Sequence, residues 1–517
     1  MARLTRRKFL KQSLAVAGAT FAVSTSARRV LGANERLNVG VAGIRGRGGG
    51  HMGEYLRMPD VEVTWLIDID RRVFPGRVSR VEQHVVQQLM KEKGVKEIRV
   101  PKNLPAEEKK KKSAERAAQQ AEFKKLAAAR LPKTVQDVRK ALEDKDLHAI
   151  SIATPNHWHA LMTIWACQAG KDVYVEKPCS HNVFEGRKAV EAARKYKRIV
   201  QHGTQSRSGD YGARMAAYAR TGKLGKLLVS HGFSSKPRGS IKFKEPKPPP
   251  PEVDFNLWLG PAQKQPYHEN LVHYNWHWFW DFGSGEIGNQ GVHQMDLARW
   301  GIPDATLPKA VVSVGGRWGY KDQGQTPNTQ FTLFDYGETV LIFEVCGLVD
   351  SKTRRVSNDF HFEAGSFIGG RFTPKDKGQK VEMPKVTTKR GPGGGHFGNF
   401  IAAVRSRKVE DLNADILEGH YSAALCHLGN ISYRLGTDGA VKDAAKALGD
   451  HAYAQEAWAK LLTHLRENRK LELDKLTCRI GRPLKFDAEN EKFIGDAEAD
   501  KLLTRDYRPP FVVPEEV

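Results

Sequence analysis

The sequence predicts an α/β protein with two domains: an N-terminal doubly wound parallel sheet, then an α+β domain with an open, mainly antiparallel sheet. Two observations carry this prediction. Short apolar strands alternate with helical segments up to Gly203, which is typical of a parallel sheet. Beyond Gly203 the chain changes to a Pro-rich loop, an aromatic stretch and several strand-like runs. At 517 residues it is long enough for two ordinary domains.

The first segment, residues 1–33, reads as an export signal. The paired arginines Arg6 and Arg7 precede Phe9, a weakly apolar run over 14–23 and then small residues. These features are typical of a twin-arginine signal, and a plain basic N-terminal region is the alternative. The sequence therefore predicts that the twin-arginine export machinery carries the protein to the periplasm or beyond. That route carries folded proteins, so a cofactor can be loaded before export.

Composition argues against several other classes of protein. No later apolar run approaches the roughly 20 residues that cross a bilayer, so no membrane span is expected. The five cysteines are scattered without CxxC spacing, so neither a disulfide framework nor a zinc site is predicted. A formal charge of +24 would suit nucleic acid, but no nucleic-acid-binding module accompanies it. Solvated helix faces are the simpler explanation of the charge.

The predicted first domain covers residues 34–203 and the second covers 204–517. Strands of the first are expected at 37–43, 61–67, 149–153, 172–175 and 198–201, and helices at 51–58, 135–142, 160–170 and 183–196. A Lys/Glu/Ala-rich stretch over 81–133 favours helix and shows little apolar periodicity, so it is predicted to be a helical insertion. In the second domain, strands are expected at 309–314 and 340–345, and helices at 397–405 and 419–434.

A glycine-rich turn joins the first strand to the first helix and predicts a Rossmann-type nucleotide site. Gly43, Gly46 and Gly48 let backbone amides and the positive helix end approach a dinucleotide pyrophosphate. The usual G-x-G-x-x-G spacing puts its second glycine at position 45, where this chain has Arg45. Either the phosphate path shifts toward Gly46, or Arg45 pairs with phosphate; Arg47 belongs to the same predicted site. A merely flexible turn is the alternative.

Asp68 stands at the end of the second strand, 25 residues beyond Gly43. An acidic side chain at this place accepts hydrogen bonds from the adenosine ribose hydroxyls and repels a 2′-phosphate, which favours NAD over NADP. Arg71 and Arg72 nearby could pair with such a phosphate. The sequence therefore leaves NAD and NADP open.

Two later segments resemble the Gfo/Idh/MocA oxidoreductase family. Residues 153–159 read Ala-Thr-Pro-Asn-His-Trp-His, and residues 175–178, after the next strand, read Val-Glu-Lys-Pro. The resemblance covers nearly everything after residue 36. It implies an NAD(P)-dependent enzyme that acts on CH–OH groups of sugars or cyclitols. It also implies that residues of these segments bind the cofactor: Thr154, Pro155, Asn156, His159, Glu176 and Lys177.

The same resemblance implies the catalytic residues. Lys177 matches the family's EKP lysine, which lies near nicotinamide and substrate, and a desolvated lysine can assist proton loss from a hydroxyl. Residues 285–296 resemble the family's D-x3-H-x2-D helix, and His293 matches its histidine. A histidine suits proton transfer near neutral pH. An ordinary surface lysine and a structural histidine are the alternatives.

Other residues are expected at the substrate. Asn289 replaces the family's first acid, one helical turn before His293, so it can orient a hydroxyl but cannot accept a proton. Asp296 is expected to support the helix or the pocket. The resemblance places Gln205 and Arg207 near the cleft between the domains. Trp276 belongs to an aromatic run that can stack on the C–H face of a sugar, with core packing as the alternative.

No metal site is predicted. His273 and His277 have the i, i+4 spacing of metal ligands on a helix, but no HExxH-like carboxylate accompanies them.

A homodimer or tetramer is expected, because an open sheet in the second domain offers a surface to another copy.

One function and two rivals follow from these residues. The first is hydride transfer between a sugar or cyclitol carbon and NAD or NADP. The cofactor is expected to be tightly bound, because no soluble nicotinamide pool is expected outside the cytoplasm. A redox-neutral glycoside-cleaving enzyme is the second; exported relatives of that kind lack the EKP lysine, so Lys177 favours the first. A sugar-binding relative without turnover is the third.

Overall fold

The computed structural model describes residues 36–376, 382 and 385–517. The predicted export signal lies outside the described residues. Among the residues described, no helix is both long enough and apolar enough to cross a membrane. All five cysteines fall within the described part, and each is buried and unpaired.

The N-terminal half builds a parallel sheet with the strand order β3-β2-β1-β4-β5-β6. Each neighbouring pair in it runs parallel. Its strands are β1 (Leu37–Ala42), β2 (Val61–Ile67), β3 (Lys133–Val135), β4 (Ala149–Ile152), β5 (Asp172–Val175) and β6 (Val200–His202). β4 and β5 are buried along their whole length, as expected for strands covered on both faces. The predicted doubly wound parallel sheet is confirmed.

Helices connect these strands, and two begin earlier than the sequence predicted. They are α2 (Arg47–Leu56), α5 (Val138–Leu142), α6 (Asn156–Gln168) and α7 (Val183–Lys195). Helix α2 includes the last glycines of the turn. Gly48 packs directly on the backbone of Gly43, where a side chain would not fit. Helix α6 starts directly after Pro155, whose φ of −61° suits the start of a helix.

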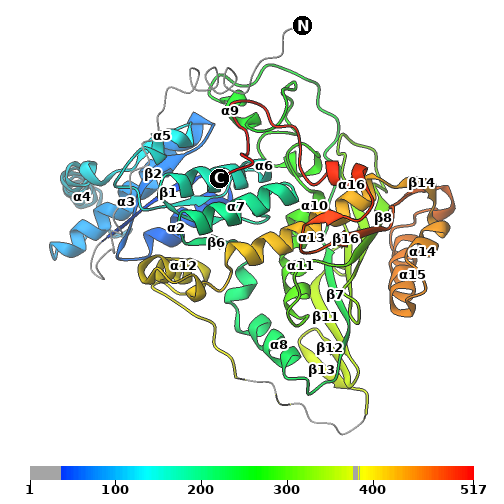
Figure 1. Ribbon diagram of the computed structural model, residues 1–517. Helices are drawn as coiled ribbons and strands as arrows, with labels where there is room; N and C mark the ends of the chain where they lie inside the picture. Colours follow the sequence, from blue (N-terminus) through cyan, green and yellow to red (C-terminus); the bar gives the residue numbers. More distant parts are fainter. Residues whose placement is uncertain (1–35, 377–381, 383–384) are drawn as a thin grey trace. The chain divides into compact units, whose positions relative to one another are not determined.

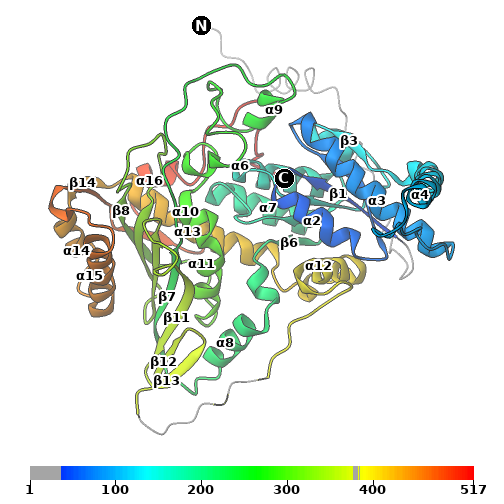
Figure 2. The ribbon, with the colours of Figure 1, turned by 180° about the vertical axis from the view of Figure 1, so that it is seen from behind.

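Two long helices occupy most of the stretch between β2 and β3. They are α3 (Phe74–Glu92) and α4 (Ala106–Ala127). In α4 the buried residues are Phe123 and Ala127, so the rest of its surface faces water. Both views show α4 at the outer edge of the first sheet, far from α10 and α11 (Figures 1 and 2). It is therefore remote from the site described below.

The C-terminal half builds a mixed sheet with the order β13-β12-β11-β7-β10-β9-β8-β15-β14. β7 and β10 run parallel, and the other neighbouring pairs along this order are antiparallel. The prediction of a mainly antiparallel sheet is confirmed. Its strands are β7 (Leu227–Ser235), β8 (Ala310–Gly316), β9 (Thr329–Asp335), β10 (Val340–Cys346), β11 (Arg355–Phe362), β12 (Gly365–Ile368), β13 (Arg371–Pro374), β14 (Thr437–Ala440) and β15 (Thr477–Ile480), with β16 (Leu484–Asp487) and β17 (Lys492–Phe493) attached at β8.

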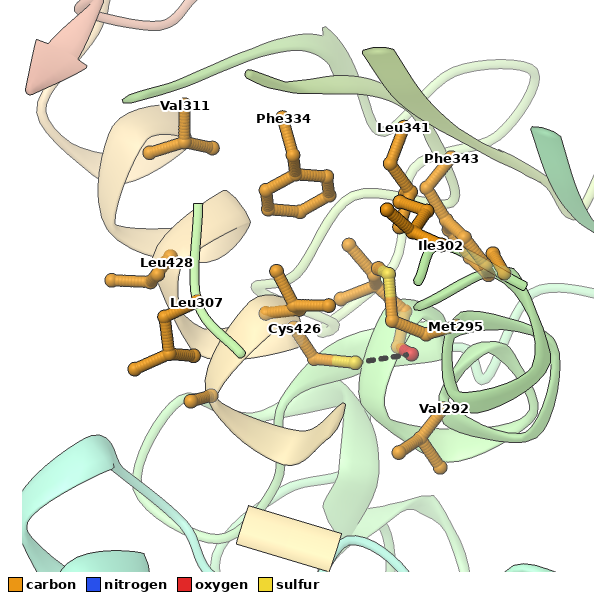
Figure 3. Packing of buried hydrophobic residues seen from close by; sticks show 14 of the residues in the cluster. Val292, Met295, Ile302, Leu307, Val311, Phe334, Leu341, Phe343, Cys426 and Leu428 are labelled. Atoms are coloured by element: carbon orange, nitrogen blue, oxygen red, sulfur yellow. Dashed lines mark hydrogen bonds between the residues drawn. The ribbon is translucent and has the colours of Figure 1, made fainter. Parts of the chain in front are cut away.

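One face of this sheet is covered by α11 (Gly291–Trp300) and α13 (Ile416–Arg434). Figure 3 shows Val292 and Met295 packing with Cys426 toward Phe334 and its neighbours on the strands. The Cys426 thiol donates a hydrogen bond to the Ile287 carbonyl at 3.2 Å. This core fixes the position of α11, which carries His293.

The opposite face of the same sheet is partly covered by α15 (Ala452–Glu467), which differs from the open face that the sequence predicted. Trp458, Leu461 and Leu465 of α15 pack in one cluster with Phe331 and Ile342 of the strands. The sequence analysis predicted no helix in this region, although its apolar residues recur at helical spacing. The predicted homo-oligomer stays a prediction, and α15 removes part of the surface expected for it.

Candidate active site

A cavity of about 650 Å³ lies between the carboxyl ends of the parallel strands and the helix pair α10 (Gly285–Asn289) and α11. It brings together most of the residues that the sequence indicated: Gly43, Arg45, Gly46, Arg47, Asp68, Thr154, Pro155, Asn156, His159, Glu176, Lys177, Gln205, Trp276, Asn289 and His293. It does not bring in Gly48, Arg207 or Asp296. The predicted residues thus come from both halves of the chain and meet in one place.

The glycine-rich turn forms one end of this cavity. Gly43 has a φ of +78°, and a Cβ there would lie 2.6 Å from the Ala153 carbonyl oxygen, so only glycine suits the position. Gly46 precedes α2 and provides no side-chain cap, which leaves the amides of the first turn available to an anion. A Cβ at Gly46 would meet nothing within 4 Å. The turn therefore fits the pyrophosphate of a dinucleotide.

Asp68 lies beside the turn and is 8% exposed. Burial raises its pKa to about 6, although hydrogen bonds from backbone amides, such as that of Asp70 at 3.0 Å, act to lower it. Arg72 forms a two-pronged pair with Asp70 at 2.7 and 2.8 Å, and Arg71 donates to the Pro251 carbonyl at 3.2 Å. Both arginines already have partners away from Asp68.

A buried network surrounds Glu176. Its carboxylate accepts a hydrogen bond from Arg47 Nε at 2.7 Å and bonds with His51 Nε2 at 3.0 Å. The other ring nitrogen of His51 bonds with Ser151 Oγ at 2.9 Å. Burial opposes the charge of Glu176, but His51 and Arg47 hold the pKa of this carboxyl well below its usual range. Sequence reasoning missed His51, because nothing in the spacing along the chain pairs it with Glu176.

Lys177 reaches across the cavity to the second half of the molecule. Its Nζ donates to the backbone carbonyl of Asn289 at 2.6 Å, with the Asn289 side-chain oxygen at 3.4 Å. Burial lowers the pKa of this ammonium, in spite of the carboxylates of Glu176 and Glu286. Lys177 therefore differs from a solvated surface lysine in both position and acidity.

His293 lines the same cavity from the first turn of α11. Burial lowers its pKa to about 3, and the charge of Lys177 acts in the same direction. The sequence reading put Asn289 and His293 on one continuous helix; instead α10 ends at Asn289 and α11 begins at Gly291. Glycines at 288 and 291 weaken a continuous helix here. Both side chains still face the cavity, and the imidazole stays neutral at physiological pH.

Arg207 and Asp296 form a buried ion pair that does not line the cavity. Arg207 Nε lies 2.9 Å from each Asp296 carboxylate oxygen, and Ser422 Oγ donates to Asp296 at 2.7 Å. The two side chains are 4% and 0% exposed. Neither side chain lines the cavity, and the roles that the sequence indicated for Arg207 near the cleft and for Asp296 as a support of the helix or the pocket stay predictions. Gln205, two residues before Arg207, does line the cavity beside Glu176.

The aromatic run divides between cavity and core. Trp276 lines the cavity, whereas Trp278 is 2% exposed and packs with its neighbours. His273 Nε2 lies 3.0 Å from Asp70 Oδ2, and His277 Nδ1 bonds with the Tyr274 carbonyl at 2.9 Å. The two histidines therefore have separate partners. Among the described residues, no group of three histidine, cysteine or carboxylate side chains is arranged to hold a metal ion.

Residues 237–283, here called the crossover segment, lie between β7 and α10 and are bonded to the first sheet's edge. Arg71 N donates to the Glu252 carbonyl at 3.1 Å, and Asp254 N donates to the Ile69 carbonyl at 2.9 Å. The Trp258 carbonyl also bonds with His157 Nε2 at 2.8 Å. Figures 1 and 2 both show α9 (Phe255–Leu259) near α6. The crossover segment thereby closes one side of the cavity.

Three charged residues of the second half were missed by sequence reasoning. Lys236 and Arg238 follow β7 and line the cavity. Arg238 pairs with Glu286, which is 1% exposed, at 2.8 Å. They belong to no motif that marks a site, so only the fold reveals them.

Comparison with known proteins gives two family matches. Residues 105–204 match the model of the Gfo/Idh/MocA oxidoreductase family's NAD-binding Rossmann fold, and residues 230–333 match that of its C-terminal alpha/beta domain. The first match begins beyond the glycine-rich turn, where Arg45 departs from the usual pattern.

Individual relatives agree over shorter stretches. Levoglucosan dehydrogenase of Pseudarthrobacter phenanthrenivorans is 23% identical over 185 residues, which is 35% of this chain and 39% of that protein. Bacillus subtilis scyllo-inositol 2-dehydrogenase (NAD(+)) is 31% identical over 104 residues, 20% of this chain and 30% of that protein. The matched part thus spans well under half of these curated relatives.

A solved structure shares the fold over a longer stretch. The WlbA dehydrogenase from Chromobacterium violaceum, solved with NADH and UDP-GlcNAcA, superposes with a TM-score of 0.52 at 16% identity. The superposition covers 78% of this chain and 95% of that one. Parts of both halves thus match models of the Gfo/Idh/MocA oxidoreductase family, and the solved structure shares the fold.

Proposed function

We propose that the protein is an exported NAD-dependent dehydrogenase that oxidises a CH–OH group of a sugar or cyclitol and keeps its cofactor bound. One observation carries the proposal: a single cavity is lined by the glycine-rich turn, Asp68, Lys177 and His293. The relatives named for levoglucosan and inositol support a small polyol as the substrate.

The nucleotide end fits NAD. The amides at the start of α2 would meet the pyrophosphate, and Asp68 would accept the ribose hydroxyls. Arg72 is held by Asp70 and Arg71 by a backbone carbonyl, so neither is set to receive a 2′-phosphate. When bound, NAD supplies the nicotinamide carbon that accepts the hydride.

Lys177 and His293 handle the hydroxyl proton. An ammonium has three N–H donors, and Lys177 uses one on the Asn289 carbonyl, so others remain for a substrate hydroxyl. Because burial lowers the pKa of Lys177, its neutral form, which can accept the proton, is reached at a lower pH than usual. His293 is neutral, so it can bond with the same hydroxyl without adding charge.

The crossover segment supports a retained cofactor. This segment is hydrogen-bonded to the backbone of residues 69 and 71 and, through the Trp258 carbonyl, to His157. These bonds keep the cavity closed on that side. Leu257, Trp258 and His273 of this segment line the cavity. A retained cofactor must be restored in place, so a second substrate takes up the hydride and the proton that the first one gives.

Export is part of the proposal and rests on Arg6, Arg7 and the segment that follows them. Replacing both arginines by lysine should keep the protein in the cytoplasm, as measured by cell fractionation. Protein that reaches the periplasm regardless would contradict the twin-arginine route.

The first experiment is to identify the nucleotide carried by protein purified without added cofactor. Denaturation followed by absorbance and mass spectrometry should show about one NAD(H) per chain. The matched control is the Gly43→Val variant, which should carry less nucleotide than the wild type. Wild-type protein that carries no nucleotide and binds neither NAD nor NADP would overturn the proposed function.

A further inference from the structure

We propose that the substrate carries an anionic group, a carboxylate or a phosphate, on its sugar or cyclitol ring, and that Lys236 binds this group. The inference rests on the proposed function, because it names the substrate class of the same cavity. It comes from the charges on the cavity wall of the second half of the molecule.

Lys236 and Arg238 are held rigidly at this wall. Strand β7 ends at Ser235, but its backbone continues to bond with the chain after β10. Lys236 N donates to the Cys346 carbonyl at 3.0 Å, and Arg238 N donates to the Gly347 carbonyl at 2.8 Å. Residues two apart on an extended chain point to the same side, and both side chains line the cavity.

The two cations differ in their partners. Arg238 is paired with the buried carboxylate of Glu286 at 2.8 Å. Lys236 instead donates to the neutral amide oxygen of Gln290 at 3.4 Å. Lys177, a third cation that reaches this wall from the first half, bonds with the Asn289 carbonyl. Two positive charges therefore face the substrate region with hydrogen-bond partners that carry no charge.

The carboxylates that line the cavity do not balance these cations. Glu176 is already held by Arg47 at 2.7 Å and by His51 at 3.0 Å. Asp137 pairs with Arg139 at 2.6 Å, and Asp68 belongs to the nucleotide end. Arg45 and Arg47 lie at the glycine-rich turn, where the cofactor's own pyrophosphate would take up their charge.

An excess of positive charge in a half-enclosed site is unfavourable until an anion enters. Partly desolvated cations lose favourable hydration free energy, and a charged acceptor restores more of it than a neutral one does. An anionic ligand therefore binds here more favourably than a neutral hydroxyl does. Burial is the main cause of the lowered pKa values of Lys177 and His293, which shows that charge at this wall is partly desolvated. Neutral sugar hydroxyls would find acceptors only among amides and imidazoles on this wall.

The test uses matched ligands that differ in charge at one carbon. Holoenzyme with its nucleotide content measured beforehand is titrated by calorimetry with D-glucuronate against D-glucose, D-galacturonate against D-galactose, and D-glucose 6-phosphate. At least one charged ligand should bind about 10- to 100-fold more tightly than its neutral partner, the range expected for a hydrogen bond to a charged group. The arms with carboxylate and phosphate identify which anion is preferred.

Variants assign the preference to one side chain. Lys236→Gln should remove the preference for the charged ligand, whereas Lys236→Arg should keep it. Lys223→Gln, at an exposed lysine of the second half, is the matched control and should leave the preference unchanged. Raising the salt concentration should weaken the charged ligands alone.

Two outcomes would overturn the inference. One is holoenzyme that binds no charged ligand of the panel more tightly than its neutral partner. The other is a preference that Lys236→Gln leaves intact. Protein without any bound or bindable nucleotide contradicts the proposed function instead, and because nucleotide content is measured on the same sample, the two failures can be told apart.

Discussion

The two ends of the cavity differ in the groups that form them. The nucleotide end consists of backbone: glycines of the turn, free amides of α2 and the strand end at Asp68. The substrate end consists of side chains from both halves, among them Lys177, Lys236 and His293. Backbone contacts tolerate few changes in sequence, whereas side chains can be exchanged on the same scaffold. The first end thus indicates the cofactor class, and the second determines which substrate is chosen.

The largest expected effect separates chemistry from nucleotide binding. Lys177→Met removes the amine that handles the substrate proton, and it should lower kcat by about 10²- to 10⁴-fold, the usual contribution of general acid–base catalysis. The nucleotide content of the purified protein should stay the same. Lys223→Met is the control. A variant that retains wild-type kcat would show that the lysine is not part of the chemistry.

A change at the opposite end should act on the cofactor instead. Gly43→Val places a side chain against the Ala153 carbonyl at a φ of +78°, a strain of about 1–3 kcal/mol. Nucleotide affinity should fall by about 10- to 100-fold, measured by nucleotide content and thermal unfolding. Gly50→Ala in α2, where a Cβ meets nothing within 4 Å, should keep the nucleotide and stabilise the fold slightly. Equal loss of nucleotide in the Gly43→Val and Gly50→Ala variants would show that the glycine-rich turn does not bind the pyrophosphate.

The pH profile distinguishes the two proton-handling groups. Lys177 accepts a proton only when neutral, so kcat/KM should rise about tenfold per pH unit until its lowered pKa is passed, then level off. His293, with a pKa of about 3, should add no limb between pH 5 and 9. His293→Asn should therefore lower the rate without moving the limb. A limb near pH 6.5 that disappears in this variant would assign the base to His293.

The smallest expected effect concerns the choice of nucleotide. Asp68→Ala removes the carboxylate that repels a 2′-phosphate, so the share of NADP in the bound nucleotide should rise about tenfold. Mass spectrometry of the released nucleotide measures this share. Asp146→Ala, at an exposed aspartate of the same half, is the control. An unchanged share would place the discrimination elsewhere than at Asp68.

Sequence patterns predicted the first half best, because its signals are local. The apolar segments that predict strands, the glycine-rich turn and the acid at the end of β2 can each be recognised within a short stretch of sequence. The structure has strands where these apolar segments predicted them. The course of the chain after residue 440 escaped prediction: α15 was hidden among charged residues, although Trp458 and Leu461 pack on the sheet. Local periodicity does not show which distant surface a helix will cover.

The site residues follow the same rule. Residues of the Thr154–His159 and Glu176–Lys177 segments are found at the cavity, as the resemblance implied. Arg207 and Asp296 pair with each other, and Lys236 and Arg238 enter the site without a motif. These placements depend on contacts between residues tens of positions apart or more, which a single sequence does not display.

The crossover segment also limits how the two halves can move. Both of its ends belong to the second half, while its middle is hydrogen-bonded to residues 69–71 and 157 of the first. A hinge that opened the cleft widely would break these bonds, so substrates exchange in a molecule that remains nearly closed. Under the proposed function, the retained nucleotide acts as an internal electron carrier of a single protein molecule, and only the two substrates cross its boundary.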